Sequence, residues 1–211
     1  MELVAFDFDG TLSDSEMTVL LGEQRSVADE MATITERAMN DEIGYATSLR
    51  ERAALLDGLP LTAAQRAFEA VALRPGAGDL IDALRDAGVH VAILTGGFER
   101  GVQAALDRAN TTVDTVVANR LPAENGALTG DVAGPLIEGT KDEALDDLTH
   151  SVEPTTTIAV GDGANDLPML EYAGLAVGYE PKPAVEPACD VTVTAMDELA
   201  ELLTERNVLD A

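Results

Sequence analysis

Polar residues of the kinds that do chemistry stand where apolar runs of this sequence end. Asp7 and Asp9 close the run LVAFDF, and residues two apart on a strand share one face, so the two carboxylates can act together. In an open parallel sheet the carboxyl ends of the strands meet at one edge, where ligands bind. We therefore expect one site built from Asp7, Asp9, Thr95, Gly96, Gly97, Lys141, Asp162, Asn165 and Asp166.

Four of these side chains are carboxylates that would repel one another strongly without a cation. The four are Asp7, Asp9, Asp162 and Asp166. Hard oxygen ligands suit Mg²⁺, which also binds the oxygens of a phosphate. Gly96 and Gly97 allow backbone N–H groups to approach a phosphate closely, and Thr95 adds a hydroxyl beside them. The pattern predicts a Mg²⁺ site that receives the phosphate oxygens of a substrate.

Apolar runs of the length of buried strands alternate with amphipathic stretches along the chain. The expected strands are 3–8, 89–97, 157–163, 175–179 and 190–195, and helices that cover them are expected at 78–88, 99–109 and 196–206. This alternation predicts an α/β fold with a doubly wound parallel sheet. Lys141 opens a further helical stretch that leads into the strand at 157–163.

The interval between the first two expected strands is too long for one crossover helix. Its apolar residues follow a helical spacing over 26–39, 45–56 and 62–73. We expect this interval to be an inserted helical cap over residues 13–75. The catalytic core would then consist of residues 1–12 and 76–211.

A second insertion is expected near the edge of the sheet, over residues 116–131. This stretch contains Glu-Asn-Gly-Ala between apolar residues. Asn-Gly in such a context is a strong signal for a two-residue hairpin turn, because both residues accept a positive φ. The sequence therefore predicts a small β-hairpin appended to the sheet.

The charge balance disfavours several classes of partner. The 211 residues include 39 acidic and 13 basic side chains, for a formal charge of -26. Such a surface repels phosphate backbones, so we expect no nucleic-acid partner. No run of about 18 apolar residues is present, so we expect no membrane partner. The dispersed acidic residues predict adaptation to high intracellular salt, with ordinary solvated faces as the simpler alternative.

The few cysteines and histidines of the sequence indicate the cellular compartment and disfavour catalytic sites that depend on histidine. The single cysteine, Cys189, cannot form an intramolecular disulfide, and the N-terminal segment has no basic leader, so we expect a cytoplasmic protein. His90 and His150 are the only histidines, and both stand in segments that read as structural or surface. A Ser-His-Asp or Cys-His site is therefore not expected.

The motifs DFDGT, LTGG, a later Lys141 and GDGANDLPML, in this order, resemble the four motifs of the haloacid dehalogenase superfamily of aspartyl-phosphate phosphatases. The similarity extends to the phosphoserine phosphatases through Glu16, SLRERAALL with Arg52, GGF, ANRL and LTGD. Together these motifs cover nearly the whole chain. The resemblance implies a Mg²⁺-dependent enzyme that hydrolyses O-phosphoserine through an aspartyl phosphate, the last step of serine biosynthesis.

The same resemblance implies a role for each core residue. Asp7 would be the nucleophile, and Asp9 would act first as an acid and then as a base. The carboxylates of Asp7 and Asp162 and the backbone carbonyl of Asp9 would hold Mg²⁺. Asp166 would orient the waters bound to the metal. The residues that hold the phosphoryl group would be Thr95, Gly96, Gly97, Lys141 and Asn165.

Selection of the substrate would belong to the cap. Glu16 matches the family position that binds the ammonium of phosphoserine, and Arg52 matches the position that binds its carboxylate. Met39 and Tyr45 match apolar positions that shield the site. The alternatives are that Arg52 pairs with a neighbouring acid on a helix surface and that Met39 and Tyr45 only fill the core.

Two positions depart from the family pattern, because Gly10 and Thr95 stand where the family usually has serine. Gly10 is common among related phosphatases that act on other small phosphate esters. The nearest alternative is therefore another phosphatase, or a phosphosugar mutase, on the same fold. A receiver-like signalling module, which also accepts phosphate on an aspartate, is an alternative of a different class, although it has no large cap and no use for an acid at Asp9.

Overall fold

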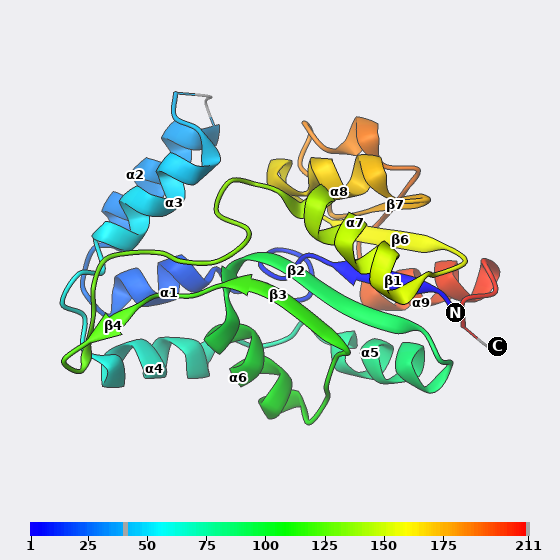
Figure 1. Cartoon of the computed structure of the whole chain (residues 1–211), viewed down its shortest axis with the longest axis horizontal. Helices are drawn as coiled ribbons and strands as arrows, with labels where there is room; N and C mark the ends of the chain where they lie inside the picture. The colour runs from blue at the N-terminus through cyan, green and yellow to red at the C-terminus, as the bar shows by residue number, and fades with distance from the viewer. Residues whose placement is uncertain (40–41, 210–211) are drawn as a thin grey trace.

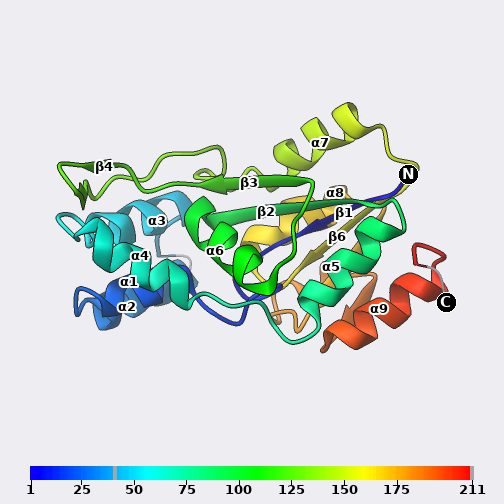
Figure 2. The same cartoon turned by 90° about the horizontal axis from the view of Figure 1, so that it is seen from below.

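A parallel sheet of six strands forms the centre of the computed structural model, which describes residues 1–39 and 42–209 (Figures 1 and 2). The strands lie in the order β3-β2-β1-β6-β7-β8. Their bounds are Leu3–Phe6 for β1, His90–Phe98 for β2, Thr115–Asn119 for β3, Thr157–Gly161 for β6, Leu175–Tyr179 for β7 and Val191–Val193 for β8. The strand order changes direction between β1 and β6, which is where open α/β sheets bind ligands.

Helices cover both faces of the sheet, so the doubly wound α/β prediction is confirmed (Figure 2). Along β1, Ala5 faces one side and Phe6 the other, because successive strand residues point to opposite faces. The helices against the side of Ala5 are α7 (Lys141–Val152) and α8 (Leu167–Tyr172). The helices against the side of Phe6 are α5 (Ala77–Asp86), α6 (Glu99–Ala109) and α9 (Met196–Glu205).

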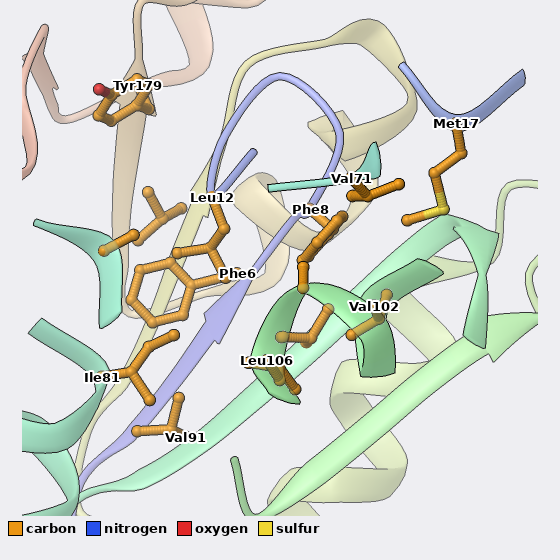
Figure 3. Packing of buried hydrophobic residues seen from close by; sticks show 14 of the residues in the cluster. Phe6, Phe8, Leu12, Met17, Val71, Ile81, Val91, Val102, Leu106 and Tyr179 are labelled. Carbon is orange, nitrogen blue, oxygen red and sulfur yellow. The ribbon is translucent and has the colours of Figure 1, made fainter. Parts of the chain in front are cut away.

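The layer on the side of Phe6 holds β1 firmly in the core. Figure 3 shows Phe6 beside Ile81 of α5 and Val91 of β2, and all three side chains are fully buried. Burial of a large apolar side chain contributes about 1.5–3 kcal/mol to stability. Asp7 follows directly on this buried strand, so the packing of the core fixes its backbone.

Four helices gather beyond the carboxyl end of β1 (Figure 1). They are α1 (Met17–Glu23), α2 (Ala28–Met39), α3 (Tyr45–Ala54) and α4 (Leu61–Ala70). α1 packs against α2 and α4, α2 packs against α3, and α4 also contacts α6 of the core. The helices α2, α3 and α4 match the helical patterns expected between residues 13 and 75, whereas the short α1 was not expected. Within the described ranges, no helix has the length and apolar character needed to cross a membrane.

The expected small β-hairpin is confirmed, but it does not pair with the main sheet. Residues 115–119 form β3, an edge strand of the parallel sheet, and the hairpin comprises only β4 (Ala123–Glu124) and β5 (Ala127–Leu128), with Asn125 and Gly126 at positive φ in its turn. Its outer backbone groups bond to the loop between α3 and α4: the Gly58 N–H donates to the Leu128 carbonyl at 2.9 Å. A short hairpin takes whichever partner satisfies its exposed N–H and C=O groups, and here the partner belongs to the helical insertion.

Candidate active site

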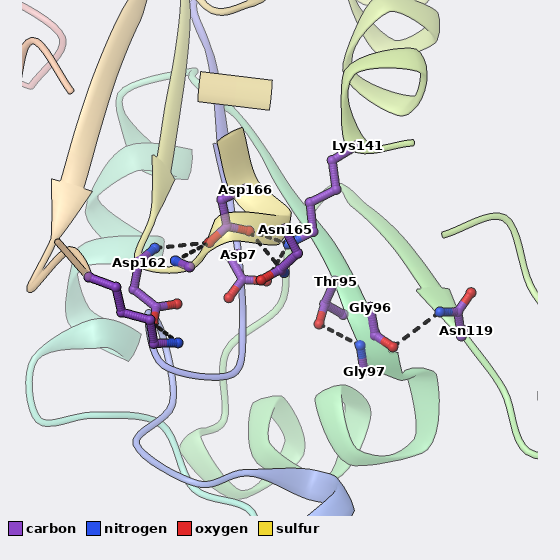
Figure 4. A network of polar contacts seen from close by, with 11 residues as sticks. Asp7, Thr95, Gly96, Gly97, Asn119, Lys141, Asp162, Asn165 and Asp166 are labelled. Carbon is purple, nitrogen blue, oxygen red and sulfur yellow. Dashed lines mark hydrogen bonds and ion pairs between the residues drawn. The ribbon is translucent and has the colours of Figure 1, made fainter. Parts of the chain in front are cut away.

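Four segments distant in sequence meet where β1 and β6 end (Figure 4). They are the loop after β1, the end of β2, the first residue of α7 and the loop after β6. Asp7 extends β1 by one residue, because its N–H donates to the Val160 carbonyl of β6 at 2.8 Å. Its side chain is only 3% exposed. The strand ends therefore converge as the sequence predicts.

Lys141 is buried between two carboxylates. Its Nζ donates to Asp7 Oδ1 at 2.5 Å and to Asp166 Oδ1 at 2.6 Å. Burial acts to lower the pKa of Lys141, but attraction to Asp166 and Asp7 outweighs it and leaves the pKa raised. The ammonium therefore stays charged and can face the oxygens of a phosphoryl group.

Asp166 organises the loop after β6 with both of its oxygens. Its Oδ2 accepts the backbone N–H groups of Asp162 and Gly163, each at 2.9 Å. Its Oδ1 accepts Lys141 and, at 3.3 Å, the amide of Asn165. Because protein donors already occupy these oxygens, Asp166 is better suited to holding Lys141 and the loop in place than to binding a metal directly.

The carboxylates of Asp7, Asp162 and Asp166 form a cluster that could hold a divalent cation. One oxygen from each lies within 4.8 Å of the others. Burial, and then repulsion from Asp166, raise the pKa of Asp7 to about 8, which Lys141 only partly offsets. A buried carboxylate with a raised pKa resists ionisation, and a divalent cation stabilises its charged form. The three carboxylates therefore fit a divalent metal ion.

Asp9 points away from this cluster. A β-carbon at Gly97 would lie 2.9 Å from Asp9 Oδ2, so the side chain lies over Gly97. Within the described residues, the buried Oδ1 of Asp9 has no hydrogen-bond partner. Burial, then the charges of Glu16 and Asp7, raise the pKa of Asp9 well above its ordinary value. The pKa of Asp7 is raised as well, but Asp7 accepts a hydrogen bond from the Lys141 ammonium and Asp9 Oδ1 has no such partner among the described residues. Asp9 is therefore better placed than Asp7 to carry a proton.

Gly10 lets the first loop approach the loop after β6. Its φ is +95°, in the region that favours glycine, and a β-carbon there would lie 2.7 Å from the Asp162 carboxylate. The glycine at this position therefore follows from the close approach of Asp162.

The end of β2 departs from regular strand geometry. β2 and β3 pair Thr95 with Ala118 and then Phe98 with Asn119, so Gly96 and Gly97 form a bulge. The Gly97 N–H donates to Thr95 Oγ1 at 2.9 Å. The hydroxyl of Tyr45 lies over Gly96, because a β-carbon there would be 1.7 Å from it. Only glycine fits beneath Tyr45, and the bulge exposes backbone to the site.

The residues expected to select the substrate lie at different distances from the carboxylate cluster. Glu16 stands immediately before α1, and burial raises its pKa while Lys182 and Arg52 oppose the rise. Arg52 donates to Thr18 Oγ1 at 3.1 Å and to the Ser48 carbonyl at 3.4 Å. It forms no salt bridge with any carboxylate of residues 1–39 or 42–209, so the alternative of a surface ion pair finds no support there. The side chain of Met39 lies outside the described residues.

Two residues of the site were not singled out from the sequence. Lys182, in the loop after β7, places Nζ 3.0 Å from Asp162 Oδ2. Asn119, the last residue of β3, donates to the Gly96 carbonyl at 3.1 Å. Lys182 follows the carboxyl end of an expected strand, so the rule that selected Asp7 and Thr95 also applies to it. Asn119 stands in the ANRL motif, but its segment was expected to form a hairpin, so the rule for strand ends did not point to it.

The chain is similar to known proteins over nearly its whole length. Residues 4–171 match the family described as haloacid dehalogenase-like hydrolase. A phosphoserine phosphatase of Halobacterium salinarum is 55% identical over 99% of this chain and 100% of its own length. One from Methanocaldococcus jannaschii is 34% identical over 96% of each chain.

Solved structures agree with these relatives. A substrate-bound phosphoserine phosphatase complex superposes with a TM-score of 0.87 at 33% identity and covers 96% of this chain and 97% of its own. A phospho-aspartyl intermediate analogue of phosphoserine phosphatase also has a TM-score of 0.87, at 32% identity over 95% of this chain and 97% of its own. The chain therefore belongs to the haloacid dehalogenase-like hydrolases and, within them, to the phosphoserine phosphatase family.

Proposed function

We propose that this protein is a Mg²⁺-dependent phosphatase that hydrolyses O-phosphoserine to serine and phosphate through an aspartyl phosphate, the closing step of serine biosynthesis in the cytoplasm. The observation that carries the proposal is that Asp7 and Asp9 have different contacts. Asp7 accepts a hydrogen bond from Lys141 at 2.5 Å, whereas the buried Oδ1 of Asp9 has no partner in the described ranges. A nucleophile and a proton donor are thus separated on one strand end.

In the first step the Asp7 carboxylate attacks phosphorus and the bond from phosphorus to the serine oxygen breaks. Asp9 gives its proton to that leaving oxygen, so serine departs neutral at its hydroxyl. In the second step Asp9, now a carboxylate, takes a proton from water as the water oxygen attacks phosphorus. The bond between phosphorus and Asp7 breaks, and phosphate and the original Asp7 carboxylate are restored.

The remaining core residues hold the phosphoryl group while its charge shifts. Lys141 offers an ammonium, Thr95 a hydroxyl, Gly96 a backbone N–H group, and Asn165 a side-chain amide in the loop after β6. The Gly97 N–H orients the Thr95 hydroxyl, to which it donates at 2.9 Å. Mg²⁺, held by the carboxylates of Asp7 and Asp162 and the backbone carbonyl of Asp9, would neutralise phosphoryl oxygens when bound. Asp166 keeps Lys141 and the loop of Asp162 in position.

Residues 13–75 would act as the cap that selects phosphoserine. Glu16 would pair with the ammonium of the substrate and Arg52 with its carboxylate, because a planar guanidinium can bind a carboxylate with two hydrogen bonds. The guanidinium of Arg52 donates hydrogen bonds only to neutral oxygens among the described residues. No carboxylate in those ranges forms a salt bridge with it, so it can bind the carboxylate of a ligand. Tyr45, which lies over Gly96, would exclude water from the reacting group.

A phosphate-release screen in molar KCl tests the proposal. Phosphoserine, phosphoethanolamine and several sugar phosphates would be compared with Mg²⁺, with other divalent ions and with a chelator. We expect repeated turnover of phosphoserine that needs a divalent ion. Preference for a sugar phosphate would favour the alternative of a related phosphatase, and transfer of a single phosphate per chain would favour a receiver-like module.

A further inference from the structure

Asn119 is a buried polar residue to which the mechanism above gives no role. It ends β3, and its side chain is 0% exposed. Its Nδ2 donates to the Gly96 carbonyl at 3.1 Å, as Figure 4 shows, and its Oδ1 accepts the Leu136 N–H at 3.0 Å. One partner is an acceptor and the other a donor, so the orientation of the amide is determined.

The bond to Gly96 replaces a bond that the sheet has lost. Gly96 and Gly97 have no paired residue on β3, because the register passes from Thr95 opposite Ala118 to Phe98 opposite Asn119. A bulge of this kind leaves backbone groups without ladder partners. The side-chain amide of Asn119 supplies the missing donor to the Gly96 carbonyl.

This bond fixes the direction of a catalytically placed peptide. The Gly96 carbonyl and the Gly97 N–H belong to one planar trans peptide unit and point in opposite directions. When Asn119 holds the carbonyl, the N–H is directed to Thr95 Oγ1, to which it donates at 2.9 Å. The hydroxyl of Thr95 accepts that bond, so its own proton remains available for a phosphoryl oxygen.

The other end of the amide reaches toward Lys141. Leu136 is buried in the segment that leads to α7, whose first residue is Lys141. On the same segment, a β-carbon at Gly134 would lie 2.4 Å from Asn119 Oδ1, so the backbone closes tightly over the amide. One side chain thus links the bulge of β2 to the segment that carries the buried lysine.

We propose that Asn119 is a positioning residue for phosphoryl transfer, which aligns the Gly96–Gly97 peptide and the Thr95 hydroxyl and ties them to the segment before Lys141. The proposal rests on the proposed function for its substrate. It also predicts that Asn119 increases the affinity of the site for inorganic phosphate. That affinity can be measured without turnover.

The test uses two variants and one stability control. Asn119→Leu keeps the approximate size and removes both hydrogen bonds, whereas Asn119→Asp keeps an acceptor for Leu136 and donates to Gly96 only while the introduced carboxyl is protonated. Leu199→Ala opens the core at α9, away from the site, and serves as the control for lost stability. Each would be compared with the unmodified chain in kcat, KM, the inhibition constant of phosphate, the thermal midpoint and the Mg²⁺ concentration for half-maximal stabilisation.

We expect Asn119→Leu to lower kcat/KM by about 100-fold and to weaken inhibition by phosphate about tenfold, with little change in Mg²⁺ dependence. The activity of Asn119→Asp relative to the unmodified chain should fall as pH rises, since ionisation removes the donor to Gly96. Leu199→Ala should lower the thermal midpoint and leave KM and phosphate inhibition unchanged. Unchanged phosphate inhibition in folded Asn119→Leu, or the same loss in Leu199→Ala, would overturn the proposal.

If the unmodified chain does not hydrolyse phosphoserine, the proposed function is refuted but the role of Asn119 is not. The role of Asn119 is then judged by stabilisation of the folded protein by inorganic phosphate. A loss of that stabilisation in Asn119→Leu supports the role, and its retention refutes it.

Discussion

The ammonium of Lys182 lies 3.0 Å from Oδ2 of Asp162, so both lysines of this chain contact carboxylates of one cluster. The backbone reinforces the contact, because the Lys182 N–H donates to the Asp162 carbonyl at 2.9 Å. Lys141 is buried, whereas the Lys182 side chain is about half exposed. Both lysines of the chain therefore stand at this site, and every other basic side chain of the sequence except its two histidines is an arginine.

Lys182→Met should destabilise the metal-free protein by about 0.5–1 kcal/mol, because Asp162 loses a partly exposed ion pair. Added Mg²⁺ should then raise the thermal midpoint of Lys182→Met more than that of the unmodified chain, since a divalent cation neutralises the same carboxylate. Lys182→Arg, which keeps the charge, serves as the control. Equal Mg²⁺ shifts in all three proteins would contradict the prediction.

Asp7→Asn should abolish detectable turnover, because an amide cannot attack phosphorus. Asp9→Asn should lower kcat by about 10² to 10⁴-fold, since proton transfer to the leaving oxygen is lost. Mass spectrometry during turnover should place the phosphate on Asp7. Phosphate on any other residue would defeat the assignment of the nucleophile.

As pH rises from about 4 to about 8, the free energy of unfolding of the metal-free protein should fall. Burial, followed by repulsion from Asp166, raises the pKa of Asp7 to about 8, and burial raises that of Asp162 in the same direction. The folded chain therefore binds more protons than the unfolded chain in this window, so unfolding becomes easier as pH rises.

Thermal midpoints measured across this pH range, with a chelator and with Mg²⁺, check the prediction. Mg²⁺ should flatten the fall, because it favours the charged carboxylates. Asp7→Asn removes one titrating group and should show a shallower fall with the chelator. A midpoint that rises with pH in the metal-free protein would count against the raised pKa values.

Arg52→Ala should lower kcat/KM for phosphoserine by about 2 to 4 kcal/mol, chiefly through KM, because the substrate carboxylate loses its partner. Phosphoethanolamine lacks that carboxylate, so its slower hydrolysis should hardly change. Arg50→Ala is the matched control, since Arg50 is on the same helix but is exposed and pairs with Glu138. Equal losses on both esters would remove the reason for assigning phosphoserine while leaving the phosphatase intact.

Molar KCl should raise the thermal midpoint, because it screens the self-repulsion of a chain with a formal charge of -26. The double variant Glu201→Lys, Glu205→Lys reduces the negative charge on the exposed side of α9 and should show a smaller dependence on KCl. A flat or falling curve for the unmodified chain would mean that the acidic surface is not an adaptation to salt.

Local patterns in the sequence were enough to predict the α/β class, the helices between β1 and β2, and the convergence of Asp7, Thr95, Lys141 and Asp162. These follow from local patterns: apolar periodicity defines the strands, and parallel strands bring their carboxyl ends to one edge.

The partners of the polar groups could not be predicted from these patterns and are known from the three-dimensional structure. The hairpin bonds to the segment after α3 rather than to the sheet, Asp9 turns toward Gly97 while Asp7 turns toward Lys141, and Asn119 fills a gap in the β2–β3 ladder. The physical reason is that the partner of a polar group depends on which distant segment lies within hydrogen-bond reach, and periodicity along the chain carries no information about that distance.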